Sequence, residues 1–165
     1  MSTANRKLLL IACSNRKVRT PGLIPAIERY DGVNYRVIHK LEREGKFPPN
    51  VDIKILSAKF GLIDASTPIA FYDQRMDRQR AEELHSQVTH ALKRIFGQKQ
   101  YDEVYVNMGK VYLGAMAELD RFKDGTNVQY ASGGIGQKMA AMKIWLLSQV
   151  HYIEELHVHY FGHLR

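Results

Sequence analysis

The stretch that decides the fold is KLLLIACSNRK, which runs from Lys7 to Lys17. Its apolar part, Leu8 to Cys13, is continuous rather than alternating, which is typical of a strand buried on both faces of a sheet. The five residues from Cys13 to Lys17 then offer a thiol, a hydroxyl, an amide and two cations. We therefore predict a central strand that ends in a polar loop able to contact a ligand.

Three further strand patterns and four helical patterns follow along the chain. The strands are predicted at 51–57, 103–108 and 127–130, and the helices at 33–44, 78–96, 111–122 and 137–150. Gly45 and Gly97 are expected to end the first two helices. Because strands and helices alternate, we predict a single α/β domain over residues 1–165, Rossmann-like, with a mostly parallel sheet of four or five strands flanked by helices.

Length, charge and cysteine content narrow the class of protein. A chain of 165 residues has the usual size of one domain. Its 24 Lys+Arg against 17 Asp+Glu favour phosphate-bearing partners, either nucleotides or nucleic acid. The single cysteine excludes an internal disulfide and a cysteine-clustered zinc site. No apolar run has the length of a membrane span or of a signal-peptide core, so we expect a cytoplasmic protein without membrane association.

Polar loops follow all four predicted strands. Open α/β sheets bind their ligands beyond the carboxyl ends of the strands, so these loops are expected to converge on one site. They cover residues 13–17, 57–61, 108–110 and 132–138. The residues that we expect to bind a ligand, from these loops and their neighbours, are Cys13, Ser14, Arg16, Ser57, Gly61, Tyr72, Asn107, Gly109, Gly133, Gly134, Gly136 and Gln137.

Two of these loops allow more than one interpretation. Lys17 is suited to clamp a phosphate or, with a lowered pKa, to act as a nucleophile or acid. Cys13 is more often a small core residue than a reactive one. The glycine-rich stretch 132–138 fits an anion site at a helix start and, equally well, a simple tight turn. It matches neither the dinucleotide pattern nor a P-loop.

The segment 59–77 is predicted to be irregular, but it is too apolar to be disordered and is expected to fold over a ligand. Within it, Asp73 follows Tyr72 and is the candidate catalytic carboxylate, suited to ribose hydroxyls or to a sugar cation. Its alternative role is to cap a turn. Lys17 and Lys59 complete the predicted catalytic set.

The C-terminal stretch carries four histidines. In a strand, His157 and His159 would share a face and form a workable pair of metal ligands. No carboxylate pattern frames these histidines, so we favour a histidine-rich surface tail and predict no metal and no cofactor. The apolar stretch 158–161 is a candidate dimer edge. The four histidines are His151, His157, His159 and His163.

Four motifs in a fixed order resemble a known group. They lie at 11–17, 55–62, 71–73 and 133–139. They resemble a family of small bacterial and phage domains of uncharacterised function, which open on Cys-Ser-x-x-Lys and continue with Ser-Ala-Lys-Tyr/Phe-Gly-Leu. That family is similar to the YaaA peroxide-stress proteins and to the Cys-Ser-x-x-Lys domain of archaeosine synthase, which modifies a 7-deazaguanine base in transfer RNA. By matching position, the resemblance implies a site at Cys13, Ser14, Lys17, Ser57, Lys59, Tyr72, Asp73, Gly134 and Gly136.

Two functions remain open at this point, together with a weaker third. The first is an enzyme that acts on a nucleobase or its bond to sugar, in a nucleotide or nucleic acid, by N-glycosidic hydrolysis or transfer or by base modification. The second is a non-catalytic nucleic-acid-binding stress protein of the YaaA type. Cations around one predicted helix favour it, namely Arg75, Arg78, Arg80, Lys93, Arg94 and Lys99. Aminoacyl or amine transfer onto a modified base is implied by the archaeosine synthase resemblance alone.

Overall fold

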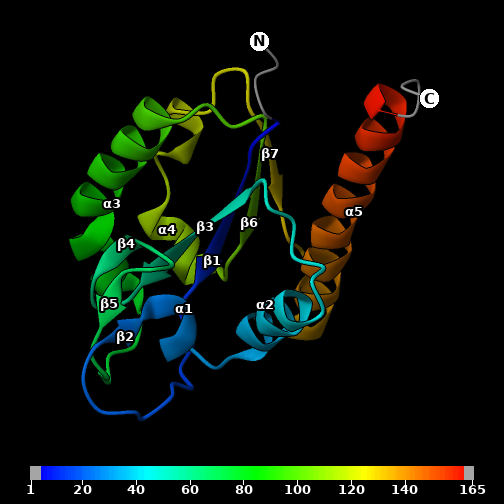
Figure 1. The fold of residues 1–165 in the computed structure, drawn as a ribbon. Coiled ribbons are helices and arrows are strands. Elements are labelled where there is room, and N and C mark those ends of the chain that lie inside the picture. The colour runs from blue at the N-terminus through cyan, green and yellow to red at the C-terminus, as the bar shows by residue number, and fades with distance from the viewer. Residues whose placement is uncertain (1–4, 162–165) are drawn as a thin grey trace.

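The computed structural model describes the backbone of residues 5–161, and the side chains of this range except 152–153, 155–156 and 158–161. Within it, five strands form one sheet in the order β4-β3-β1-β6-β7, and β2 pairs with β5 (Figure 1). The strands are β1 Lys7–Ala12, β2 Ile24–Pro25, β3 Val51–Ser57, β4 Gly61–Asp64, β5 Pro68–Ile69, β6 Glu103–Asn107 and β7 Asn127–Tyr130. The helices are α1 Ala26–Arg29, α2 Val33–Arg43, α3 Arg78–Gln98, α4 Lys110–Ala115 and α5 Ile135–Phe161, with a 3-10 turn at Leu119–Arg121.

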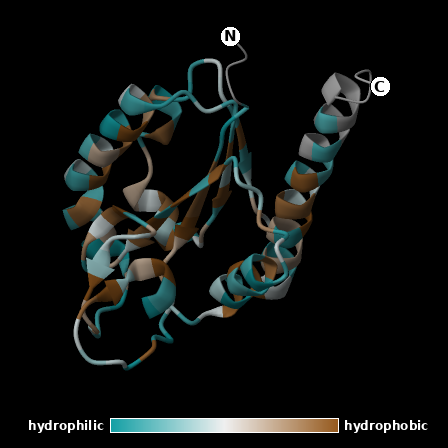
Figure 2. Cartoon of the chain, viewed as in Figure 1, coloured by the Kyte–Doolittle hydropathy of each residue, from teal (hydrophilic) through white to brown (hydrophobic). Residues whose placement is uncertain are grey.

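Strand β1 lies at the centre of the sheet and is covered on both faces. It pairs in parallel with β3 on one side and with β6 on the other, while β7 runs parallel to β6 and β4 antiparallel to β3. Leu9 and Ile11 pack in the core beneath α2 and α5, and Leu8 and Leu10 pack in the core beneath α3 and α4. Figure 2 shows the apolar residues gathered on these central strands. The predicted α/β fold with a mostly parallel sheet is confirmed.

Helix α2 ends where the glycine pattern predicts. Gly45 has a φ of 66°, which glycine adopts without the steric cost that other residues meet. Its N–H donates to the Glu42 carbonyl at 3.0 Å, and the Lys46 N–H donates to the Leu41 carbonyl at 2.8 Å. These two bonds form a Schellman motif, which satisfies carbonyls that the end of the helix would leave unpaired.

Two other helix predictions are wrong in their bounds. Helix α3 continues through Gly97 to Gln98, so this glycine does not end it. The helix predicted at 111–122 is divided into α4 and the 3-10 turn. The division follows from backbone bonds that span three residues, from Met116 N–H to Leu113 O and from Leu119 N–H to Met116 O. Tighter turns of this kind still keep apolar side chains on one face.

The segment 59–77 is more regular than predicted. After a tight turn at Gly61, which has a φ of 75°, β4 pairs antiparallel with β3. Strand β5 then pairs with β2, which brings this segment against the loop that follows β1. Residues 70–77 have no regular structure and carry Asp73. The predicted irregular stretch is therefore confirmed only for residues 70–77.

Helix α5 continues beyond its predicted end at residue 150 to Phe161, so the strand that the histidine pair would need does not form. In a helix, positions 157 and 159 point to different sides, so they do not form the ligand pair that a strand would. The His159 side chain and the candidate dimer edge at 158–161 lie outside the described side chains, and His163 lies outside the described residues. Within the described part, no three metal-ligating side chains cluster, and no helix combines the length and apolarity needed to cross a membrane.

Candidate functional site

The sheet order creates a crevice between β1 and β6. The chain leaves β1 toward α2 on one face of the sheet and leaves β6 toward α4 on the other face (Figure 1). Neighbouring strands whose connections diverge in this way leave a crevice at their carboxyl ends, where open α/β sheets bind ligands. A cavity of about 480 Å³ lies there. This volume is in the usual range for small-molecule sites.

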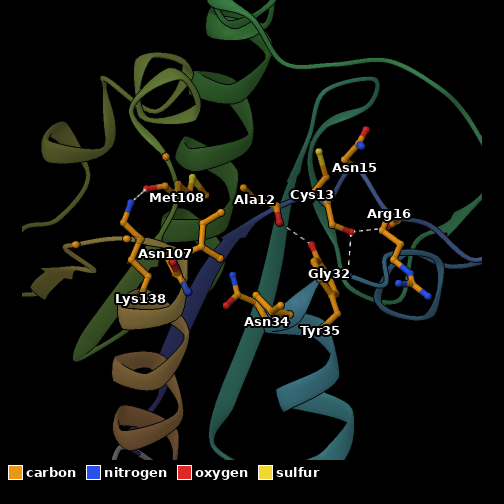
Figure 3. Close-up of a pocket in the computed structure, with 16 residues that line it drawn as sticks. Ala12, Cys13, Asn15, Arg16, Gly32, Asn34, Tyr35, Asn107, Met108 and Lys138 are labelled. Carbon is orange, nitrogen blue, oxygen red and sulfur yellow. Dashed lines mark hydrogen bonds between the residues drawn. The ribbon is translucent and has the colours of Figure 1, made fainter.

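The cavity wall combines strand ends with helix starts (Figure 3). The loop 13–16 after β1 and residues 107–109 at the end of β6 form one part, and residues 32–35 at the start of α2 and 133–135 at the start of α5 form the other. The first turn of a helix has N–H groups without intrahelical partners and carries a partial positive charge. Lys138 and Arg16 add two cationic side chains to the lining. The cavity is therefore suited to an anion.

Ser14 fixes the start of α2 against the loop after β1. Its Oγ donates to the Arg16 carbonyl at 2.6 Å and accepts from the Gly32 N–H at 3.2 Å. A Cβ at position 32 would lie 2.7 Å from the Ser14 Cβ, so this approach requires glycine. The Tyr35 hydroxyl donates to the Ala12 carbonyl at 2.8 Å. The first turn of α2 is thus tied to the end of β1 at two points.

The glycine-rich stretch is a capped helix start. Gly133 has a φ of 89°, and the Gln137 Oε1 accepts from the Gly134 N–H at 2.9 Å. Gln137 therefore caps α5 and does not line the cavity. The Lys138 Nζ donates to the Met108 carbonyl at 2.9 Å, which ties α5 to the end of β6. This stretch is therefore a tight turn and also a helix N-terminus that faces the cavity.

Asn107 has hydrogen-bonding capacity that the described residues do not use. Its side chain is 3% exposed, and its Nδ2 donates to the Met142 Sδ at 3.5 Å, a weak acceptor. Its Oδ1 has no hydrogen-bond partner within the described range. Asn34, on the first turn of α2, has a fully buried Oδ1 without a partner there. Buried carboxamide oxygens are rarely left unpaired, so the Asn34 Oδ1 indicates a ligand or water that completes it, and the free Oδ1 of Asn107 can bind the same group.

The predicted catalytic residues lie beside this cavity rather than in it. The Lys17 and Lys59 ammonium groups lie 4.5 and 5.8 Å from the centroid of the Tyr72 ring. Burial lowers the pKa of Lys17 below its usual 10.5, and the charges of Cys13 and Asp73 offset part of this shift. The Asp73 side chain is exposed. The structure thus gathers the two ammonium groups around one aromatic ring, with the Asp73 charge acting on Lys17.

A buried triangle of hydroxyls supports this cluster. The fully buried Ser57 Oγ lies 3.0 Å from the Tyr30 hydroxyl and 2.9 Å from the Tyr72 hydroxyl, and it accepts from the N–H groups of Lys59 and Phe60. Burial raises the pKa of Tyr30 to about 12 and raises that of Tyr72 far above its usual value. These hydroxyls stay neutral and brace the segment that carries Asp73.

A second cavity, of about 310 Å³, lies across the loop Cys13–Asn15 from the first. The same three residues line both cavities, and residues 74–76 and Tyr112 complete the second. The Cys13 Sγ lies 3.3 Å from the Tyr112 hydroxyl and accepts from the Ala58 N–H at 3.4 Å. Asp73 immediately precedes the residues that line this smaller cavity.

The structure brings about half of the predicted site residues to the larger cavity. These are Cys13, Ser14, Arg16, Asn107, Gly109, Gly133 and Gly134. It places Lys17, Ser57, Lys59, Gly61, Tyr72, Asp73, Gly136 and Gln137 outside the lining. Sequence reasoning missed the start of α2. The sequence did contain a signal for it, because a helix that follows a parallel strand begins near the carboxyl edge of the sheet.

Comparison with known proteins places the chain in a family. Residues 8–144 match the model of a family of unknown function, DUF6884. The chain belongs to this family. The matched range contains every residue that lines the larger cavity. No curated protein matches the chain.

One solved structure shows the same fold. The crystal structure of AF0587, a protein of unknown function, is similar with a TM-score of 0.52 and 16% sequence identity. The similarity covers 85% of this chain and 44% of AF0587, so this chain spans less than half of that protein. At this identity, the likeness shows the fold alone.

Proposed function

We propose that this chain is a cytoplasmic enzyme that acts on a nucleobase or its bond to sugar, in a nucleotide or a nucleic acid. One observation carries the proposal. The N-termini of α2 and α5 meet at a cavity on the carboxyl edge of the sheet, beside the carboxamides of Asn107 and Asn34, whose Oδ1 atoms have no partner among the described residues. A ligand with both an anionic group and hydrogen-bonding groups matches this surface, and a nucleotide has both.

The phosphate would lie against the two helix starts. The Arg16 Nε lies 2.9 Å from a carboxylate oxygen of Asp31, which Arg36 also binds through two hydrogen bonds of 3.1 Å. Because Arg36 stays on this carboxylate, Arg16 can turn to a phosphate without leaving it unpaired. Lys138 supplies the second cation from α5. These two residues take the role that the sequence gave to Lys17.

The reacting part of the substrate would cross the loop Cys13–Asn15 into the smaller cavity. There it would approach the segment that carries Asp73, whose carboxylate is suited to stabilise a developing sugar cation. The lowered pKa of Lys17 increases the share of neutral amine, which favours proton transfer or nucleophilic attack. The resemblance to the YaaA proteins and to the archaeosine synthase domain supports a nucleobase as the target.

Mass spectrometry of a nucleotide and oligonucleotide panel tests this proposal. We expect the wild-type protein to release a base or change its mass, and Asp73→Asn to slow this reaction on the order of a hundredfold or more. Asp124→Asn is the matched control, because Asp124 is exposed and lies before β7, at the opposite edge of the sheet. An unchanged panel, or equal turnover by the Asp73 variant, would overturn the proposal.

A second candidate is a nucleic-acid-binding protein without catalysis. Arg75 and Arg78 favour it, because both are exposed and form no ion pair within the described residues. Arg80, by contrast, donates to the carbonyls of Ala58 and Lys59, so it is committed to the fold. This candidate predicts binding that weakens steeply with salt, survives Asp73→Asn and yields no product.

A further inference from the structure

A third cavity, of about 470 Å³, lies between α3 and α4. None of its lining residues lines either of the two cavities described above. Its lining is Arg78, Ala81, Glu82, Lys110, Val111 and Gly114. Val111 is 43% exposed, which is high for an apolar side chain, and two cations stand beside it against one carboxylate.

This third cavity is related to the other two through the chain segments that line it. Residues 74–76 and Tyr112 line the smaller cavity, and residues 78–82 and 110–114 line the third. The same two chain segments therefore form the walls of both. The smaller cavity in turn shares the loop 13–15 with the larger one. The first two cavities therefore adjoin, and the third is lined by residues next in sequence to those of the second.

The cations that line the second and third cavities are available to a ligand. Arg75, Arg78 and Lys110 are exposed, and none forms an ion pair with another described residue. An opposing charge comes from Glu82, which lines the third cavity. A row of solvated cations beside an exposed apolar side chain fits a strand whose phosphates face the cations and whose bases or sugars cover the apolar surface.

We propose that the groove between α3 and α4 binds the continuation of a single nucleic-acid strand whose target nucleotide lies in the cavity between β1 and β6. This inference rests on the proposed function and narrows its substrate to a nucleotide within a strand. The larger cavity alone has the volume of a small-molecule site. A free nucleotide would leave the smaller cavity partly used and the third one empty.

Binding measurements on two double variants test the inference. Arg78→Ser with Lys110→Ser removes two charges from the groove, and Lys93→Ser with Arg94→Ser removes two exposed charges near the other end of α3. The probes are a labelled mixed-sequence DNA 12-mer, the same sequence in RNA, the DNA duplex, and the common nucleoside 5′-monophosphates. The DNA and RNA arms identify which type of strand is preferred.

We expect the groove variant to weaken binding of the strand on the order of tenfold and to reduce its salt slope by about 1.4, while binding of monophosphates is unchanged. The control variant should bind like wild type. Equal weakening in both variants, or a duplex that binds as tightly as the strand, would overturn the inference. If monophosphates bind and strands bind no better, the inference fails and the proposed function stands. If neither binds, both fail.

Discussion

Lys17 is held half-buried against an aromatic ring, and this placement sets its titration. Burial lowers its pKa from 10.5, whereas the negative charges of Cys13 and Asp73 raise it. In the native state the ammonium form is therefore disfavoured. The buried ammonium group therefore destabilises the fold fully at pH values below the pKa of Lys17 in the folded protein. This destabilisation disappears as the pH rises toward the pKa of Lys17 in the unfolded chain.

We predict that the Lys17 amine titrates with a midpoint below 10.5, measured by NMR on the protein with ¹³C-methylated lysines. Asp73→Asn should lower this midpoint further, because it removes a charge that favours the ammonium form. Lys17→Arg identifies the signal. A midpoint at or above 10.5 would show that the amine is not desolvated as the structure has it.

A substitution of Asn107 should weaken nucleotide binding without lowering the stability of the fold. Asn107→Leu replaces a buried carboxamide that has one weak described bond with an apolar side chain of similar size. Removing such a group is neutral or stabilising for the fold. We expect an unchanged or raised Tm, but a loss of nucleotide affinity of about tenfold, near one hydrogen bond of about 1.4 kcal/mol.

Calorimetric titration with a nucleoside monophosphate and thermal unfolding measure the two effects on the same samples. A structural role alone would lower both the Tm and the affinity. Unchanged affinity would place the ligand elsewhere.

Among the elements, the ends of α2 and α3 give predictions of opposite sign. Gly45→Ala forces a φ of 66° on a residue with a Cβ and should cost about 1 kcal/mol. Gly97 lies inside α3, where a Cβ meets open space, so Gly97→Ala should stabilise by about 0.5–1 kcal/mol. Urea unfolding of both variants checks this pair. A destabilised Gly97→Ala protein would mean that α3 ends before this glycine.

Most elements could be predicted from the sequence because each has a recognisable local pattern of apolar residues. The continuous apolar run of β1 and the apolar face of α3 required no tertiary knowledge. The strands β4 and β5 were missed because both are short. Strand β4 forms a tight hairpin with β3, and β5 forms only by pairing with β2, about forty residues earlier in the chain. The length of α5 was missed for a different reason. The helix was predicted to end at residue 150, although the helical pattern had no stop signal there.

At the scale of the whole molecule, strand order decided which predicted residues meet. The rule for open α/β sheets gave the correct edge, but local pattern does not show that β6 pairs beside β1. Because β6 lies beside β1, Asn107 and Gly109 at its carboxyl end line the cavity. The loop with Asp73 instead follows β5, which pairs with β2 outside the five-stranded sheet. For this reason Lys17 and Asp73 form a cluster beside the cavity and not within it.

The buried hydroxyls also make the whole fold sensitive to alkali. The pKa of Tyr30 rises from 10.0 to about 12 by burial, so its neutral form belongs to the native state. Its contribution to stability is fully present below about pH 10 and is lost as pH rises toward 12. Between pH 9 and 11.5, we predict that the wild-type protein loses about 2 kcal/mol more stability than the Tyr30→Phe variant. Urea unfolding at the two pH values measures this, and an equal loss in both proteins would contradict it.

The central claim is that the starts of α2 and α5 hold the phosphate of a nucleotide. Backbone N–H chemical shifts, followed by ¹H–¹⁵N NMR during titration with nucleoside 5′-monophosphates, test it most directly. We predict the largest saturable shifts at residues 33–35 and 133–135, which line the cavity at the two helix starts. Inorganic phosphate should move the same signals more weakly. Saturable shifts confined to other parts of the chain, or none at any of these six positions, would contradict it.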